Sequence, residues 1–269
     1  ANIIMQFVFN GTLEGSTGQS MSTGGGYSFV SSSSIRLTGS GSTCSPQSTC
    51  GWLTSPPIFA QSMRHGATMT VWFRWISSGY YHNEDIISFI DRGDGGTYDD
   101  GRSVTVLHSE YNRNGMSRHT GYSSAMPGFV LLAFVVTGDT CGMNTYQMFW
   151  VDSSGVSTAP GGTNMTFGNN INLCTMPYIQ FNRHCWPYGC SSRETIELDD
   201  LRVYDAPVGI NGLAEIYAAG PDSTPSPLPF SPSPSSWPQP PSLSPHPPPA
   251  PPPSPPSGHT LSCAPGCLT

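Results

Sequence analysis

The stretch ATMTVWFRWI, residues 67–76, alternates with the two-residue period of a β-strand. One face of that strand would carry Met69, Val71, Phe73 and Trp75, and the other Thr70, Trp72 and Arg74. A strand with one continuous apolar face is typical of a sheet that packs on a hydrophobic core. The stretch therefore predicts a β fold.

A second stretch, FVLLAFVV at residues 129–136, is apolar without interruption. Such a run is typical of a strand covered on both faces, which indicates a central strand of a two-layer sandwich. Shorter strands between turns rich in Gly, Ser and Asn are expected at Ile3–Phe9, Tyr27–Val30, Ile35–Leu37, Asp85–Ile90, Ser103–His108, Thr145–Val151, Tyr178–Phe181 and Thr195–Tyr204. The first 220 residues thus predict an all-β sandwich.

The last of these strands, TIELDDLRVY at residues 195–204, contains a change of parity. The apolar residues 196 and 198 point to one face of a regular strand, whereas the apolar residues 201 and 203 point to the other. A bulge or bend at Asp199-Asp200 would bring all four side chains to one face.

The chain changes character twice after residue 204. Residues 211–220, NGLAEIYAAG, predict one short helix with Asn211 as its N-cap and Gly220 as its C-terminal stop. Beyond it, 19 of the 27 prolines fall at or after Pro221. Proline fixes φ and lacks an N–H, so an extended polyproline II tail is expected there. The predicted division is a sandwich over residues 1–220, the tail over 221–258 and a short cysteine-containing segment over 259–269.

Charge and hydropathy exclude some partners. The formal net charge is −7, and all ten basic residues are arginine. This balance lacks the positive patch that binds nucleic acid or an anionic membrane, so neither partner is expected. The longest apolar run, residues 129–136, is far shorter than the roughly 20 residues of a transmembrane helix, so no membrane span is expected.

Cysteine usage indicates an oxidising compartment. Eight cysteines in a chain rich in Gly and Ser favour disulfides over free thiols. Short spacing favours the pairs Cys44–Cys50, Cys185–Cys190 and Cys263–Cys267, which leaves Cys141 and Cys174 to each other. A zinc site is the alternative, but no C-x2-C spacing supports it. The sequons Asn10-Gly11-Thr12 and Asn164-Met165-Thr166 predict N-glycosylation at Asn10 and Asn164, which together with the cysteines predicts secretion.

Four different motifs occur one after another along the sandwich region. They are FVFNGT at residues 7–12, MTVWF at 69–73, YQMFWVDSSG at 146–155 and LDDLRVY at 198–204, followed by the short helix. This order resembles the laminin-G-like, concanavalin-like jelly roll. The resemblance implies an antiparallel sandwich but no single function, because this scaffold hosts lectins, adhesion modules, structural modules and some glycosidases.

The tail consists of Ser-Pro dipeptides and proline runs. It resembles the hydroxyproline-rich glycoproteins of plant and green-algal cell walls. A globular head with such a tail resembles algal matrix or flagellar-hair (mastigoneme) components. The resemblance implies hydroxylation and O-glycosylation of prolines, with candidates at Pro225, Pro227, Pro232, Pro234, Pro247, Pro248, Pro249, Pro251, Pro252 and Pro253.

Two loops carry side chains suited to a ligand. The loop DRGDGGTYDDG at residues 91–101 offers hard oxygen ligands for Ca²⁺ from Asp91, Asp94, Asp99 and Asp100. A solvated turn is the alternative, since Asp and Gly both favour turns. Trp186 and Tyr188 could stack on sugar rings, with ordinary loop packing as the alternative. No cofactor other than calcium is expected.

Glu197-Leu198-Asp199 resembles the start of the paired-carboxylate motif of some jelly-roll glycosidases. The second glutamate is absent, because Leu201 and Arg202 stand where it would fall. Two carboxyl groups are needed to divide the acid and nucleophile roles, so no enzymatic activity is expected.

These observations predict a structural subunit of an extracellular glycosylated fibre or matrix. The proline-rich tail would pack against neighbouring subunits of a homo-oligomeric filament. The alternative is a lectin-like carbohydrate-binding adhesion module on a glycosylated stalk.

Overall fold

The computed structural model describes residues 1–30, 33–39, 51–77, 85–91, 103–108, 126, 128–157, 168–169, 171–186, 189–191 and 194–221. The chain divides into two units, Ala1–Ser231 and Pro232–Thr269, and every described residue lies in the first. Within these ranges, no helix has the length and apolar character needed to cross a membrane. The polyproline II tail lies outside the described residues and stays a prediction.

The larger sheet contains nine of the described strands. Its path runs through β11 (Gly155–Ser157), β10 (Asn144–Asp152), β9 (Val130–Gly138), β6 (Ala67–Ser77), β16 (Thr195–Tyr204), β4 (Ser34–Leu37) and β3 (Tyr27–Phe29). Off this path, β1 (Ile3–Phe7) pairs with β16 and β12 (Gly168–Asn169) pairs with β10. Every one of these pairings is antiparallel.

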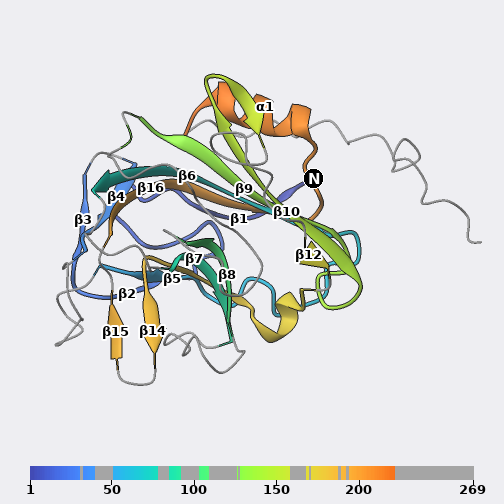
Figure 1. Cartoon of the computed structure of the whole chain (residues 1–269), viewed down its shortest axis with the longest axis horizontal. Coiled ribbons are helices and arrows are strands. Elements are labelled where there is room, and N and C mark those ends of the chain that lie inside the picture. Colours follow the sequence, from blue (N-terminus) through green and yellow to red (C-terminus); the bar gives the residue numbers. More distant parts are fainter. Residues whose placement is uncertain are drawn as a thin grey trace, which may run out of the picture. The chain divides into compact units, whose positions relative to one another are not determined.

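The smaller sheet has the order β2 (Ser22–Thr23), β5 (Leu53–Thr54), β13 (Tyr178–Phe181), β7 (Asp85–Ile90) and β8 (Ser103–His108). A separate hairpin is formed by β14 (His184–Trp186) and β15 (Gly189–Ser191). Figure 1 shows the two sheets as stacked layers, with this hairpin on the side of the smaller sheet and α1 (Ile210–Ala219) beyond the larger one. The predicted antiparallel all-β sandwich is confirmed, whereas kinship with laminin-G-like domains stays a prediction.

The core between the sheets is rich in aromatic side chains. Phe89 of the smaller sheet and Phe134 of the larger one bring their ring centroids to 4.8 Å, so the two layers are in direct contact. Phe73 and Trp75 of β6 pack edge-to-face in the same core. The apolar face predicted for residues 67–76 is therefore confirmed.

Strand β9 is covered on both faces, as its uninterrupted apolar run predicts. Within Val130–Val136 the even-numbered side chains belong to the core between the sheets, and the odd-numbered ones pack with Leu213 and Ile216 of α1. The second cover is thus a helix on the outer face of the sheet (Figure 1). Complete burial of one Leu or Ile side chain contributes roughly 1.5–3 kcal/mol, so these two residues anchor α1.

The predicted bulge in β16 is present at Asp199-Asp200. The register against β6 shifts between Asp199 and Arg202, and Asp200 has a φ of 42°. Leu198 before the bulge and Leu201 after it both enter the core between the sheets. One extra residue therefore restores a single apolar face.

The start of α1 differs from the prediction. The helix begins at Ile210, and its N-cap is Gly209 in extended conformation rather than Asn211. Asn211 already lies inside the first turn, and no side chain caps the helix. The end agrees with the prediction, because Gly220 adopts a φ of 80°, a conformation that glycine reaches at little cost.

Candidate functional site

Glu197 of β16 lies between two arginines on the outer face of the larger sheet. Arg36 of β4 donates to Oε1 from Nε at 2.8 Å and from Nη2 at 2.5 Å. Arg74 of β6 donates to Oε2 from Nε at 2.9 Å and also from Nη2. The cross-strand register places Arg36 and Arg74 directly opposite Glu197 on its two neighbouring strands. Both carboxylate oxygens are engaged by guanidinium groups, which suits a structural ion pair rather than a general acid.

The two aspartates of the bulge lie on this same outer face. Because Leu198 and Leu201 both point inward, the side chains of Asp199 and Asp200 both point outward. Asp199 accepts a hydrogen bond from Ser33 Oγ at 2.9 Å, and Asp200 accepts one from Gln6 Nε2 at 2.7 Å. In a regular strand two neighbouring residues face opposite sides, and the bulge removes this alternation at Asp199 and Asp200.

Asp200 also forms a buried ion pair with Arg202. Burial disfavours the charged guanidinium of Arg202, but hydrogen bonds and charge interactions with Asp200 and, to a smaller extent, Tyr204 together raise its pKa. Burial raises the pKa of the neighbouring Tyr204. We call Arg36, Arg74, Glu197, Asp199, Asp200 and Arg202 the outer polar strip. Within it, Glu197 pairs with Arg36 and Arg74 across strands, which supports the register of β4, β16 and β6, whereas Asp200 and Arg202 pair within β16.

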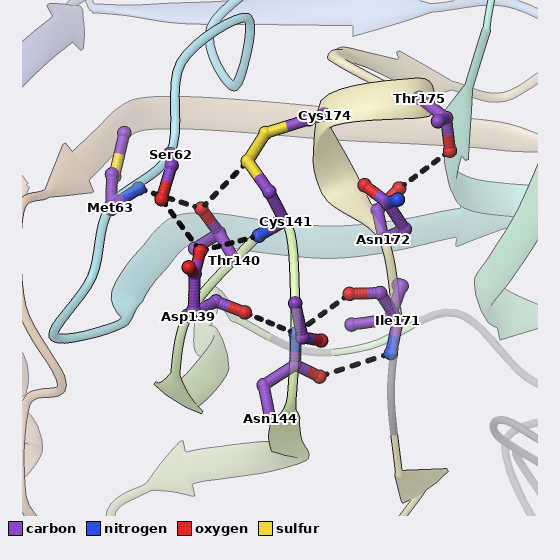
Figure 2. The surroundings of a disulfide bond; sticks show 11 residues. Ser62, Met63, Asp139, Thr140, Cys141, Asn144, Ile171, Asn172, Cys174 and Thr175 are labelled. Carbon is purple, nitrogen blue, oxygen red and sulfur yellow. Dashed lines mark hydrogen bonds between the residues drawn. A yellow bond between two sulfur atoms is a disulfide. The ribbon is translucent and has the colours of Figure 1, made fainter.

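A second polar network surrounds the disulfide Cys141–Cys174 (Figure 2). Cys141 lies in the β9–β10 turn, and Cys174 lies in a short 3-10 helix at Leu173–Thr175. Their Cα atoms are 5.1 Å apart. This is the long-range pair that remained after the local cysteine pairs were assigned from spacing.

Hydrogen bonds tie the same turn to two further segments, as Figure 2 shows. The Asp139 carboxylate accepts from Ser62 Oγ at 2.7 Å and from the Cys141 N–H at 2.9 Å. Both hydrogen bonds hold the pKa of Asp139 below its usual value, and the bond from Ser62 has the larger effect. Asn144 Nδ2 donates to the Ile171 carbonyl at 2.7 Å, and Asn144 Oδ1 accepts from its N–H at 3.0 Å. The disulfide and these hydrogen bonds therefore hold the β9–β10 turn against the segments around Ser62 and Ile171.

The hairpin β14–β15 carries the aromatic residues predicted to bind sugar. Its backbone register places Cys185 opposite Cys190 and Trp186 opposite Gly189. The register is compatible with the expected Cys185–Cys190 disulfide, because directly opposed residues of an antiparallel pair have closely spaced Cβ atoms. Tyr188 falls outside the described residues. Stacking of Trp186 and Tyr188 on a sugar stays a prediction.

Of the other predicted sites, the structure places the Asn10 sequon and Asp91. Asn10 and Thr12 are both exposed at the turn after β1. Asp91 of the predicted calcium loop follows β7, while Asp94, Asp99 and Asp100 lie outside the described residues. Also outside are Asn164, the tail prolines, and the remaining cysteines, Cys44, Cys50, Cys263 and Cys267. In the described ranges, no cluster of three or more His, Cys, Asp or Glu side chains could hold a metal ion.

An aromatic pair with one exposed ring lies at the edge of the larger sheet and was missed by the sequence analysis. Tyr27 of β3 is 37% exposed, and its ring meets that of the partly buried Phe29 edge-to-face at a centroid distance of 6.0 Å. The alternation Tyr-Ser-Phe signals that both rings share one face. Among the described strands, β3 lies at the end of the larger sheet. This position follows from the strand order and is not encoded in the local sequence.

Comparisons with known proteins give structural likenesses only. No protein-family model and no curated protein matches the chain. One similar solved structure is the botulinum neurotoxin serotype G binding domain, with 13% identity and a TM-score of 0.41 over 81% of this chain and 51% of that one. A second is the binding domain of botulinum neurotoxin DC in complex with rat synaptotagmin II, with 11% identity and a TM-score of 0.43 over 80% of this chain and 51% of that one.

A third similar structure is domain 4 of AbnA, a GH43 extracellular arabinanase from Geobacillus stearothermophilus, in complex with arabinotriose. Its identity is 14% and its TM-score 0.48, over 80% of this chain and 98% of that one. This chain spans only 51% of the length of each neurotoxin domain. These likenesses do not decide what the chain binds.

Proposed function

We propose that the chain is a non-catalytic subunit of an extracellular, glycosylated fibre or matrix. In this assembly the proline-rich segment 221–258 of one subunit packs against the sandwich of a neighbour. The observation that carries the proposal is the concentration of proline in one segment, because 19 of the 27 prolines fall at or after Pro221.

The composition of that segment favours docking over free suspension in solvent. Residues 222–269 carry a single charged side chain, Asp222. A polyproline II segment is already extended before it binds, so it loses little conformational entropy on docking. At about 3.1 Å per residue, 38 residues span roughly 120 Å, whereas a 220-residue head is only about 45 Å across. One tail is therefore long enough to lie along a neighbouring head.

Three features support an extracellular, non-catalytic role. The Cys141–Cys174 disulfide is typical of an oxidising compartment. The exposed Asn10 sequon is accessible for glycosylation, and O-glycans on hydroxylated tail prolines would keep a surface poor in charge soluble. Glu197, the first carboxylate of the glycosidase-like sequence, is bound on both oxygens by arginine.

Truncation after Pro221 tests the proposal. The full chain is expected to form filaments or large particles by electron microscopy and light scattering, and the truncated chain to form folded monomers. Circular dichroism of the truncated chain controls for folding. Assembly that survives the truncation would rule the proposal out.

A lectin-like adhesion module is the second candidate, and the β14–β15 hairpin favours it. The backbone register places Trp186 opposite Gly189, a residue without a side chain. Glycan-array binding by the full chain that is lost in Trp186→Ala and Tyr188→Ala would support this function. Absence of array binding by the parent chain would reject it.

A further inference from the structure

The outer edge of β3 offers backbone groups and aromatic rings together. Val30 donates its N–H to the Ser34 carbonyl at 3.0 Å, and Thr38 donates its N–H to the Gly26 carbonyl at 2.7 Å. In an antiparallel pair, hydrogen-bonded positions alternate with positions whose N–H and C=O point away. Given the register of Tyr27 with Leu37 and Phe29 with Ile35, the backbone groups of Tyr27 and Phe29 point away from β4.

This edge is also apolar and uncharged. Among the described residues five large apolar side chains are exposed, and two of them, Tyr27 at 37% and Val30 at 42%, belong to it. Its charged neighbour Arg36, opposite Ser28, is held by Glu197 on the outer face. We call residues 27–30 the β3 edge. Within the described part of the chain, no strand pairs with its free side.

The ligand that fits this edge is extended, neutral and rich in carbonyl groups. Proline has no N–H, and the carbonyls of a polyproline II helix have no internal partner, so they can accept from the outward N–H groups of Tyr27 and Phe29. Aromatic side chains on a receptor are the usual partners of proline-rich segments. Residues 223–258 of this chain contain no Asp, Glu, Lys or Arg and have these properties.

A second copy of β3 fits less well. The strand has only three residues, and very short edge strands resist edge-to-edge pairing because few ladder hydrogen bonds form. A tail has no such limit, since it can continue past the strand over Val30 and the neighbouring surface.

We propose that the β3 edge is the docking site for the proline-rich tail of a neighbouring subunit, with Tyr27 as the principal stacking residue. The proposal rests on the proposed function, because it names the surface on which the tail packs. Tyr27 stacks on the proline rings, and the outward N–H groups set the direction of the tail along the edge.

Binding of a synthetic peptide tests this site. The peptide covers residues 222–258, made once with proline and once with hydroxyproline, and is titrated by fluorescence anisotropy into the fragment Ala1–Pro221. Tyr27→Ser is expected to weaken binding about two- to tenfold, the range of one aromatic contact. Tyr27→Phe, which keeps the ring, stays within about twofold of the parent. Ile210→Ser is the matched control, because Ile210 is an exposed apolar residue of α1 and should leave affinity unchanged.

The possible outcomes distinguish a failure of the docking site from a failure of the proposed function. Equal peptide affinity of the parent and Tyr27→Ser overturns the docking site and leaves the proposed function standing. If the peptide binds no variant and the truncated chain still assembles, the proposed function and the site fail together. If Tyr27→Ser changes self-association of the fragment but not peptide affinity, the edge pairs with a second copy and our assignment is wrong.

Discussion

Glu197→Gln keeps the size of the side chain and removes the negative charge that lies between Arg36 and Arg74. The Glu197 side chain is 1% exposed, whereas those of Arg36 and Arg74 are 37% and 28% exposed. Removal of one partner from a fully buried ion pair costs about 3–5 kcal/mol, because the other charge is left buried and unpaired. Water around the two arginines reduces that penalty. We therefore expect the free energy of unfolding to fall by about 2–3 kcal/mol.

Urea unfolding of the fragment Ala1–Pro221 measures the loss, with disulfides intact. The buried indoles of Trp75 and Trp150 report the transition through their fluorescence. For a domain of this size the expected loss lowers Tm by about 4–12 °C.

A triple variant provides the matched control. Arg36→Met, Arg74→Met and Glu197→Leu together replace all three charges by apolar groups, and such replacements are often neutral or stabilising. We expect this variant to unfold within about 1 kcal/mol of the parent. The reasoning is refuted if Glu197→Gln matches the parent within about 0.5 kcal/mol, or if the triple variant is as unstable as the single one.

Two further predictions concern the network of Figure 2. Replacing both Cys141 and Cys174 by serine opens a loop with a sequence separation of 33 residues. By the loop-entropy estimate this lowers the free energy of unfolding by about 4 kcal/mol, and a loss below about 1 kcal/mol in urea titrations would contradict it. For Asp139 the folded state has the lower pKa, so the carboxylate adds stability above its ordinary pKa of 3.8 and loses it as pH falls through the folded value. Asp139→Asn should therefore melt below the parent at pH 7, and the two Tm values should converge in acid; a constant difference across pH would refute this role.

In the outer polar strip, the strand register decides which charged side chains bind one another. Glu197 begins a sequence that resembles a glycosidase motif, yet the cross-strand register brings a guanidinium group from each neighbouring strand onto it. The same residue types that could support catalysis on an open sheet here bind one another. Sequence alone shows the acids and the arginines but not that they meet.

Local sequence patterns were sufficient to predict many of the strands of the head. The two-residue alternation of 67–76, the apolar run at 129–136 and the parity change at Asp199-Asp200 each lie within about ten residues of chain. The physical reason is that strand period, bulge and helix stop depend on the nearest side chains. These features were therefore predictable, and the structure reproduces β7, β8, β13 and β16 with the expected bounds. The two-residue strands, and the three-residue strands other than β3, were missed, because so few residues contain no measurable period.

Tertiary structure alone decided the contacts between distant segments. Arg36 and Arg74 lie 161 and 123 residues from Glu197, and only the order of β4, β16 and β6 brings them together. Likewise, the second cover of β9 is a helix, and β3 lies at an edge where Tyr27 stays exposed. Such pairings depend on the packing of the whole sandwich rather than on any local pattern. The amino-acid sequence by itself determined a β head with a proline-rich tail, and the strand order decided which of the described strands lie at the edges of that head.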